Sequence, residues 1–261
     1  MKVLTIAGSD SSGGAGIQAD IKTISALGGY AASVVTAVTV QNTCGVYGIH
    51  AIPPEIVRGQ IEAVMTDIEP TAVKIGMTND ASTVSVIAET LSKFKPEYIV
   101  FDPVMVSTSG CSLMEDDAVM AVTRLLMPIS TVITPNLKEA ETLLGICIRT
   151  VDDMIAGAEE LLRYGSQAVL LKGGHLSGND MTDVLMIKGD PKPKLYTSVK
   201  IDSRNTHGTG CTLSSAIATL LAQGKPLTEA VQGAKDYVHR AIESAVNINI
   251  GKGHGPLKHI F

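Results

Sequence analysis

The amino-acid sequence predicts an α/β protein of three layers, in which helices cover both faces of a mostly parallel sheet and antiparallel strands extend one edge. Two observations predict this fold. Up to about residue 175, short runs that are apolar throughout alternate with longer amphipathic stretches, which is typical of a parallel sheet covered on both faces. After Gly173 the pattern changes to strand-like runs joined by Gly, Asn, Asp and Pro turns, which predicts an antiparallel edge.

The elements follow one another in a regular order. We predict strands in KVLTIAG, AASVVTAVTVQN, TAVKIGM, YIVFDPVMV, TVITPN and AVLLKGGH. Helices are predicted between them in AGIQADIKTISALGG, PPEIVRGQIEAVMTDI, DASTVSVIAETLSKF, EDDAVMAVTRLLMPI and LKEAETLLG. Two or three strands then precede two helices, at roughly 209–223 and 226–247, and a glycine-rich tail. No repeat or linker divides the chain, so residues 1–261 are expected to form a single domain.

The bulk properties indicate a small-molecule partner. A net charge of −5 argues against nucleic acid, and an aromatic content of 3% without Trp removes stacking platforms for bases. No run approaches the roughly 18 apolar residues of a membrane span, and the N-terminal apolar run is too short for a signal peptide. The four cysteines are far apart in sequence, which fits a reducing compartment and predicts a cytoplasmic protein.

Polar and glycine-rich segments follow the predicted strands. They read GSDSSGGAG, QNTCG, GMTND, DPVMVSTSG, TPNLKEAE and KGGH. Ligands of open α/β sheets bind at the carboxyl ends of the strands, so the convergence of six such segments predicts a site there. The glycines of GSDSSGGAG do not have the spacing of a dinucleotide-binding loop, and no P-loop motif occurs.

The segment NTHGTGCTLS, residues 205–214, opens a predicted helix. Its Gly-Thr-Gly turn directs backbone N–H groups and a helix dipole to one point, which predicts an anion site. Cys211 beside this point is a candidate redox centre, nucleophile, metal ligand or weak base. A metal is disfavoured because His207 and Cys211 have no evident partner pair, and a nucleophile is disfavoured because no base is marked. The helix N-terminus is expected to lower the pKa of Cys211.

Asn136 and Glu139 lie one helical turn apart at the start of LKEAETLLG. This spacing fits a capping box, and it also fits a magnesium site facing phosphate oxygens, with Asp102 as a second carboxylate. Lys172 ends an apolar strand, where it is placed to neutralise phosphate. An anion-binding turn, a lysine, a carboxylate pair and a proton acceptor together indicate phosphoryl transfer.

These motifs resemble the ribokinase-like small-molecule kinases, and within them the hydroxymethylpyrimidine and phosphomethylpyrimidine kinases of thiamine synthesis. The resemblance covers TIAGSDSSGGAGIQADIKT, TAVTVQNTCGV, KIGM, VFDPVMVSTSG, TPNLKEAE, LLKGGH, NTHGTGCTLSSAIA and GHGP, which is nearly the whole chain. It implies a ribokinase-like fold and a homodimer. It also implies an ATP- and Mg²⁺-dependent kinase that phosphorylates 4-amino-5-hydroxymethyl-2-methylpyrimidine and then its monophosphate.

The resemblance also implies residue roles. It assigns the pyrimidine pocket to Gly8, Asp20, Gln41, Met77 and Val104. It assigns nucleotide binding to Asn136, Glu139, Lys172 and Thr209, and the metal to Asp102 and Glu139. It assigns catalysis to Lys172, to the anion hole formed by Gly208, Thr209 and Gly210, and to Cys211, which takes the place of an aspartate base found in most of the superfamily.

The loop after DPVMV departs from the family pattern. The family often has a lysine there, whereas this chain has VSTSGC with Ser107, Thr108 and Cys111. Two alternatives stay open at this point: a pyridoxal or pyridoxine kinase, which shares the fold and can share the cysteine, and a ligand-binding protein without catalysis.

Overall fold

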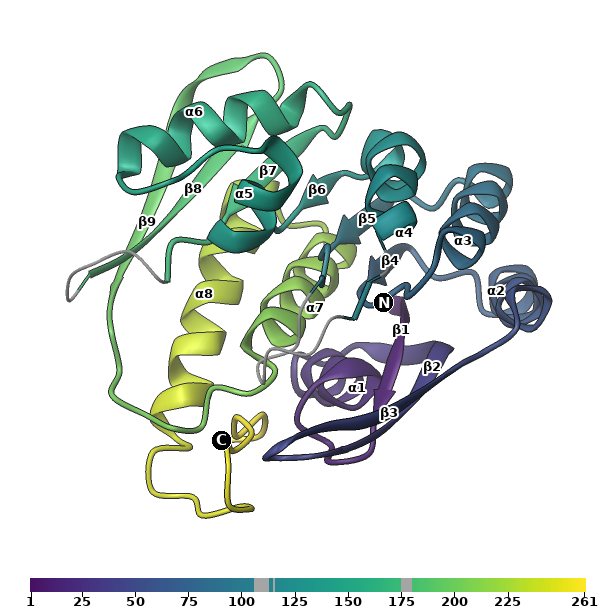
Figure 1. The fold of residues 1–261 in the computed structure, drawn as a ribbon, viewed down its shortest axis with the longest axis horizontal. Helices are drawn as coiled ribbons and strands as arrows, with labels where there is room; N and C mark the ends of the chain where they lie inside the picture. Colours follow the sequence, from purple (N-terminus) through teal and green to yellow (C-terminus); the bar gives the residue numbers. More distant parts are fainter. Residues whose placement is uncertain (106–112, 115, 175–179) are drawn as a thin grey trace.

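A single nine-stranded sheet runs through the part of the chain that the structure describes, in the order β3-β2-β1-β4-β5-β6-β7-β8-β9 (Figure 1). The structure is a computed structural model that describes residues 1–105, 113–114, 116–174 and 180–261. Strands β2, β1, β4, β5, β6 and β7 are parallel, while β3 at one edge and β8 and β9 at the other are antiparallel. The predicted fold class and the predicted antiparallel edge after Gly173 are confirmed.

The strands are β1 (Lys2–Asp10), β2 (Tyr30–Asn42), β3 (Gly45–Ala51), β4 (Ala72–Ile75), β5 (Tyr98–Phe101), β6 (Val132–Ile133), β7 (Ala168–Leu171), β8 (Asp180–Ile187) and β9 (Asp190–Val199). The helices are α1 (Gly16–Ala26), α2 (Pro54–Asp67), α3 (Ala81–Phe94), α4 (Asp116–Ala121), α5 (Leu137–Leu144), α6 (Val151–Leu162), α7 (Thr209–Ala222) and α8 (Leu227–Glu243).

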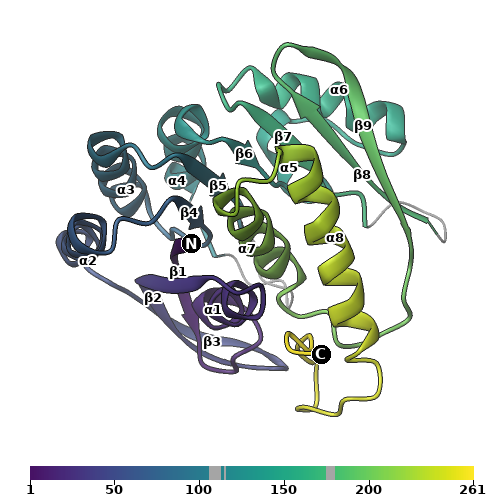
Figure 2. The same cartoon turned by 180° about the vertical axis from the view of Figure 1, so that it is seen from behind.

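Helices form a layer on each face of the sheet. Successive side chains of a strand point to opposite faces. Ile75 of β4 and Phe101 of β5 therefore belong to one core, with residues of α2, α3 and α6. Ala72 and Val100 belong to a second core, with residues of α1, α7 and α8. Figures 1 and 2 show these two groups of helices from opposite sides.

Three local features differ from the sequence prediction. Strand β3 was not predicted because its seven residues, GVYGIHA, contain two glycines and are largely exposed. Helix α6 was not predicted either, although Thr150 and Asp153 form a capping box at its start. The helix predicted over 115–129 ends as α4 at Ala121, and the chain continues in a wider turn and a tight turn at Met127–Ile129, where Pro128 lacks an N–H.

A fully buried ion pair lies in the core between the sheet and helices α1 and α7. Nζ of Lys74 on β4 is 2.9 and 2.8 Å from the two carboxylate oxygens of Asp20 on α1, and both side chains are 0% exposed. Hydroxyl groups of Thr5 and Ser215 donate to the same carboxylate, at 2.6 and 2.7 Å. Asp20 thus ties α1 to β1, β4 and α7.

The segment after α8 folds back over the molecule and lies beside residues from its beginning (Figure 2). The N–H of His254 donates to the carbonyl of Thr43 at 3.0 Å, in the turn between β2 and β3. The N–H of His207 donates to the carbonyl of Gly255 at 3.1 Å. The ring of His259 lies 3.0 Å from the hydroxyl of Thr212 on α7. The segment therefore contacts both the β2–β3 turn and the start of α7.

No helix in the described ranges is long and apolar enough to span a membrane.

Candidate active site

The turn before α7 is built on a glycine that no other residue could replace. Gly208 has a φ of 86°, in the left-handed region, and a Cβ there would overlap the backbone carbonyl of Gly14. Among the described residues, no side chain caps the first turn of α7. The turn at Gly208–Gly210 therefore has the backbone geometry of an anion site at a helix N-terminus.

Cys211 lies where the N-termini of two helices meet. It is in the first turn of α7, and the backbone N–H of Gly16, the first residue of α1, favours its thiolate form. Burial raises the pKa of the Cys211 thiol to about 11, because it outweighs the effects of Lys74 and of the Gly16 N–H. The expectation of a lowered pKa is therefore wrong: desolvation of the thiolate exceeds the effect of the helix dipole.

Lys172 and Asp102 meet directly beneath the turn. Nζ of Lys172 donates to Oδ1 of Asp102 at 2.8 Å, and Thr134 donates to the same oxygen at 2.9 Å. The other oxygen, Oδ2, faces the turn, since a Cβ on Gly210 would lie 3.2 Å from it and 3.5 Å from Nζ of Lys172. The structure thus brings Asp102, Lys172 and the turn together, as predicted from the ends of their strands.

Glu139 is the third charged group of this cluster. Burial raises its pKa to about 7, Asp102 acts in the same direction, and Lys172 opposes both. Burial also disfavours the charge on Lys172, but the carboxylates of Asp102 and Glu139 outweigh it and raise the pKa of Lys172. Because Asp102 affects the ionisation of both Lys172 and Glu139, and these two affect each other, Lys172 and the two carboxylates form one electrostatic unit.

The capping box at the start of α5 is present. Oδ1 of Asn136 accepts from the N–H of Glu139 at 2.9 Å, and Oε2 of Glu139 accepts from the N–H of Asn136 at 2.7 Å. The capping interpretation of N-x-x-E is therefore confirmed. The cap holds the Glu139 carboxylate beside Asp102 and Lys172, so it also positions this charge, while the roles of Asn136 and Glu139 toward a ligand stay predictions.

The carboxylate oxygens of this cluster fit a magnesium ion. Mg²⁺ binds one or two carboxylates in such sites and keeps several waters, and Oδ2 of Asp102 faces the anion-binding turn. The described residues contain no group of three or more His, Cys, Asp or Glu side chains that could hold a metal on their own. The carboxylates of Asp102 and Glu139 therefore suit a metal ion that is bound partly by the phosphates of a ligand.

Three of the residues predicted for the pyrimidine come from strands β1, β4 and β5 or from the residues just after them. Gly8 and Met77 are in contact, since a Cβ on Gly8 would lie 3.0 Å from the Met77 sulfur. Val104 follows Asp102 closely, and its N–H donates to the Asp102 carbonyl at 2.8 Å. Asp20 instead lies in the core, its carboxylate bonded to three side chains, so its contact with a pyrimidine stays a prediction.

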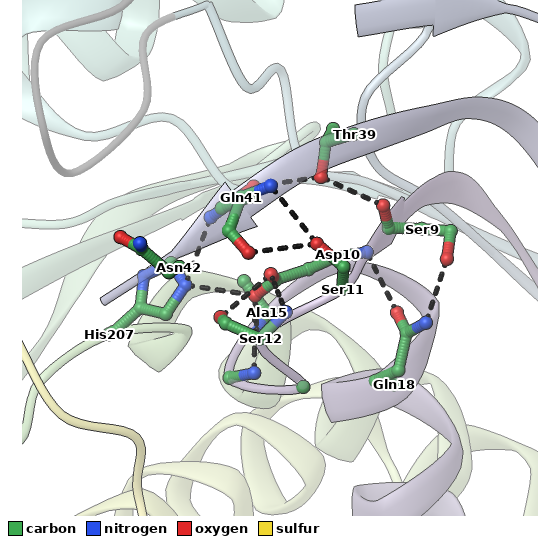
Figure 3. A network of polar contacts seen from close by, with 12 residues as sticks. Ser9, Asp10, Ser11, Ser12, Ala15, Gln18, Thr39, Gln41, Asn42 and His207 are labelled. Carbon is green, nitrogen blue, oxygen red and sulfur yellow. Dashed lines mark hydrogen bonds and ion pairs between the residues drawn. The ribbon is translucent and has the colours of Figure 1, made fainter. Parts of the chain in front are cut away.

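Gln41, the residue before the end of β2, lies inside a polar network that the sequence did not reveal (Figure 3). Its amide lies 3.2 Å from Nε2 of His207 and 3.1 Å from Oγ1 of Thr39. The same His207 nitrogen lies 3.0 Å from Oδ2 of Asp10. The sequence analysis did not predict Asp10 and His207 as site residues, because 197 positions separate them. The signal available was that each is a polar residue in a segment already expected to lie at the site. Ser107, Thr108 and Cys111 lie outside the described residues.

Comparison with known proteins gives consistent relatives. A family model described as phosphomethylpyrimidine kinase matches residues 10–258. A hydroxymethylpyrimidine/phosphomethylpyrimidine kinase of Rhizobium meliloti is 51% identical over 257 residues, which cover 98% of this chain and 96% of the relative. A solved phosphomethylpyrimidine kinase from Clostridium difficile has a TM-score of 0.82 and 48% identity, covering 93% of this chain and 99% of its own. A Bacillus subtilis pyridoxal kinase, solved as an ADP complex, has a TM-score of 0.90 and 36% identity, with 99% and 97% covered.

Proposed function

Because this chain belongs to the phosphomethylpyrimidine kinase family, we propose that it transfers the γ-phosphoryl group of ATP to 4-amino-5-hydroxymethyl-2-methylpyrimidine and then to the resulting monophosphate, in thiamine biosynthesis. The observation that carries the proposal is the family match over nearly the whole chain, together with the meeting of Lys172, Asp102 and the Gly208–Gly210 turn. We also propose that residues 1–261 act as one kinase domain in the cytoplasm.

Each group has a role that its surroundings support. The N–H groups of the Gly208–Gly210 turn and the ammonium of Lys172 stabilise negative charge on the transferring phosphoryl group. Mg²⁺ bound with ATP would neutralise phosphate oxygens, and Asp102 and Glu139 are the carboxylates placed to hold it, directly or through water. Asn136 holds Glu139 through the capping box, and Cys211 accepts the proton of the pyrimidine alcohol.

Product analysis tests the proposal directly. Incubation with the pyrimidine alcohol, ATP and Mg²⁺, followed by mass spectrometry, should show the monophosphate first and the diphosphate later. If one site performs both transfers, the alcohol should competitively inhibit phosphorylation of the monophosphate. Formation of no phosphorylated pyrimidine, with ADP released only on addition of another alcohol, would refute the substrate assignment.

Pyridoxal is a second candidate substrate, since the pyridoxal kinase of Bacillus subtilis has a TM-score of 0.90 with this chain. Steady-state rates on pyridoxal and on the pyrimidine alcohol, each with ATP, distinguish the two. We expect kcat/KM to be larger for the pyrimidine alcohol.

We propose that the protein is a homodimer. Exposed apolar side chains on the strands of one sheet edge support this: Val38 is 45% exposed, Val40 64% and Tyr47 67%. Sedimentation velocity measures the mass in solution, and a monomer at micromolar concentration would contradict the proposal.

Replacing Gln41 with leucine should raise the KM for the pyrimidine alcohol about tenfold while the KM for ATP changes less than about twofold. The amide can donate to and accept from an aminopyrimidine edge, and its loss leaves ligand polar groups unpaired at about 1–3 kcal/mol. Gln60→Leu is the matched control, because Gln60 uses its amide to bind the backbone of Val35 outside the site. An equal rise of both KM values in Gln41→Leu would contradict the assignment.

Replacing Glu139 with glutamine should lower kcat about tenfold at pH 8, because it removes a charge near the phosphates while the amide oxygen can still cap α5. The pKa of Glu139 is raised to about 7, so the wild-type carboxyl takes up a proton as the pH falls below 7. The ratio of wild-type to variant kcat should therefore shrink toward one near pH 6. Glu141→Gln on the same helix is the control, since Glu141 only holds the N–H of Ile148. A pH-independent ratio would show that the charge of Glu139 is not used.

A further inference from the structure

The carboxylate of Asp10, at the end of β1, is surrounded by hydrogen-bond donors. Its Oδ1 accepts from the N–H and the hydroxyl of Ser12, at 2.8 and 2.7 Å. Its Oδ2 accepts from the N–H groups of Gly14 and Ala15, at 3.1 and 2.8 Å, and lies 3.0 Å from Nε2 of His207. The side chain is 4% exposed, so these partners, rather than water, determine its state.

These hydrogen bonds hold the loop before α1 and the turn before α7, and both segments lie next to Cys211. The loop that Asp10 holds leads into Gly16, whose N–H favours the thiolate form of Cys211. The same loop carries Gly14, whose carbonyl packs against Gly208 so closely that a Cβ has no room there. His207 directly precedes Gly208. Asp10 therefore holds the α1 loop and, through His207, the turn that carries Cys211.

The bond to Asp10 determines which nitrogen of His207 carries a proton. Burial works to raise the pKa of Asp10, but the hydrogen bonds from His207 and Ser12 outweigh it and hold that pKa below its usual range. An ionised carboxylate has no proton to donate, so Nε2 of His207 must be an N–H that donates to Oδ2.

The proton on His207 in turn determines how the amide of Gln41 is oriented. One amide atom, Nε2 as drawn, lies 3.2 Å from Nε2 of His207. The single N–H of that ring nitrogen donates to Asp10 and can be shared with a carbonyl oxygen in this place, whereas an amide NH₂ group here would face another donor. The other amide atom lies 3.1 Å from Oγ1 of Thr39, whose hydroxyl donates to the carbonyl of Ser9 at 3.0 Å and can accept from an amide NH₂. Figure 3 draws Nε2 toward His207 and Oε1 toward Thr39, and turning the amide by 180° leaves no two donors facing each other.

We propose that Asp10 and His207 are positioning residues of the kinase, which hold the turn of Cys211 against the α1 loop and orient the Gln41 amide toward the pyrimidine with its NH₂ group on the side of Thr39 and its carbonyl on the side of His207. This inference rests on the proposed function, because that function assigns Gln41 to the pyrimidine.

The first test reads the tautomer of His207 in the ligand-free protein. Long-range ¹H–¹⁵N correlation spectra distinguish a proton on Nε2 from a proton on Nδ1, and the His207 signals are assigned by their loss in His207→Phe. We expect the proton on Nε2. A neutral ring with its proton on Nδ1 would overturn the proposal. This arm needs no substrate, so it decides the inference even if the pyrimidine is not phosphorylated and the proposed function fails.

The second test is a kinetic cycle of His207→Phe and Gln41→Leu. The phenyl ring keeps the contact with Gly14 but donates nothing. His207→Phe should raise the KM for the pyrimidine alcohol about tenfold in the wild-type background and less than twofold in the Gln41→Leu background, because it acts through the amide. An equal rise in both backgrounds would overturn the orienting role.

Asp10→Asn tests the clamp itself. An asparagine places its NH₂ group against donors at one of the two positions, so the loop and the turn lose bonds. We expect kcat on the pyrimidine alcohol to fall at least tenfold. Asp153→Asn, which removes a carboxylate that caps α6 away from the site, should leave kcat unchanged. Wild-type kcat in folded Asp10→Asn would overturn the positioning role.

Discussion

Replacement of Cys211 with alanine should lower kcat/KM for the pyrimidine alcohol by about 100-fold, within the usual range for loss of a general base, and lower it much less for the monophosphate. An alcohol must lose a proton during the transfer, whereas a phosphate monoester with a second pKa near 6 reaches the site largely deprotonated. A small fraction of thiolate suffices as the acceptor because in a loose transition state little bond has formed to the attacking oxygen, so the proton can leave late and convert the thiolate to the thiol.

The pH dependence follows from the raised pKa of the thiol. With a pKa of about 11 the thiolate fraction rises about tenfold for each pH unit below that value, so the wild-type rate on the alcohol should rise from pH 7 to 9. Cys211→Ser should lose this rise while keeping a polar side chain of similar size at the first turn of α7. Steady-state kinetics on both acceptors is the measurement, with Cys147→Ala, an exposed cysteine, as control. Large and equal losses on both acceptors would show that Cys211 shapes the turn and does not accept the proton.

Replacement of Lys74 with methionine should lower the free energy of unfolding by about 3–5 kcal/mol, because it leaves the Asp20 carboxylate buried without its cation. Burial disfavours the ammonium, but the charge of Asp20 outweighs it and raises the pKa of Lys74, so Lys74 is charged at neutral pH. Urea denaturation followed by circular dichroism measures the loss, which is a large part of the 5–15 kcal/mol typical of a folded domain.

Two further variants complete this test. Combining Lys74→Met with Asp20→Leu removes both charges and should recover much of the loss, since apolar replacements of whole buried pairs are often tolerated. Lys194→Met breaks an exposed pair with Asp190 and should cost at most about 1 kcal/mol. A loss below about 1 kcal/mol in Lys74→Met would mean that the pair is dispensable.

The parts of the fold and of the site that depend on neighbouring residues were predictable from the sequence. Apolar strands, the turn before α7 and the capping box at Asn136 depend on residues within a few positions of one another. Lys172 could be noticed because a lysine ends an otherwise apolar strand, at the edge of the sheet where ligands bind.

The rest depends on contacts between distant residues. Lys74 also stands in an apolar run, but its meaning depends on Asp20, which is 54 positions away on another element. The raised pKa of Cys211 depends on burial beneath Gly16 and beside charges of β4 and β5, and no spacing in the sequence encodes that burial. The strand β3 was not predictable because it is short, contains two glycines and buries no apolar face against the core.

The folded-back segment after α8 has a consequence for how the enzyme is made. Its bonds join Thr43 to His254, His207 to Gly255 and Thr212 to His259, so the β2–β3 turn and the start of α7 are held by residues that the ribosome adds only after α8. Strands β1 and β2 can pair early in translation, but the site cannot take its final form until these residues have left the exit tunnel. Chains that stop before residue 253 should therefore have a folded sheet and no kinase activity, whereas chains that include residues 253–261 should be active.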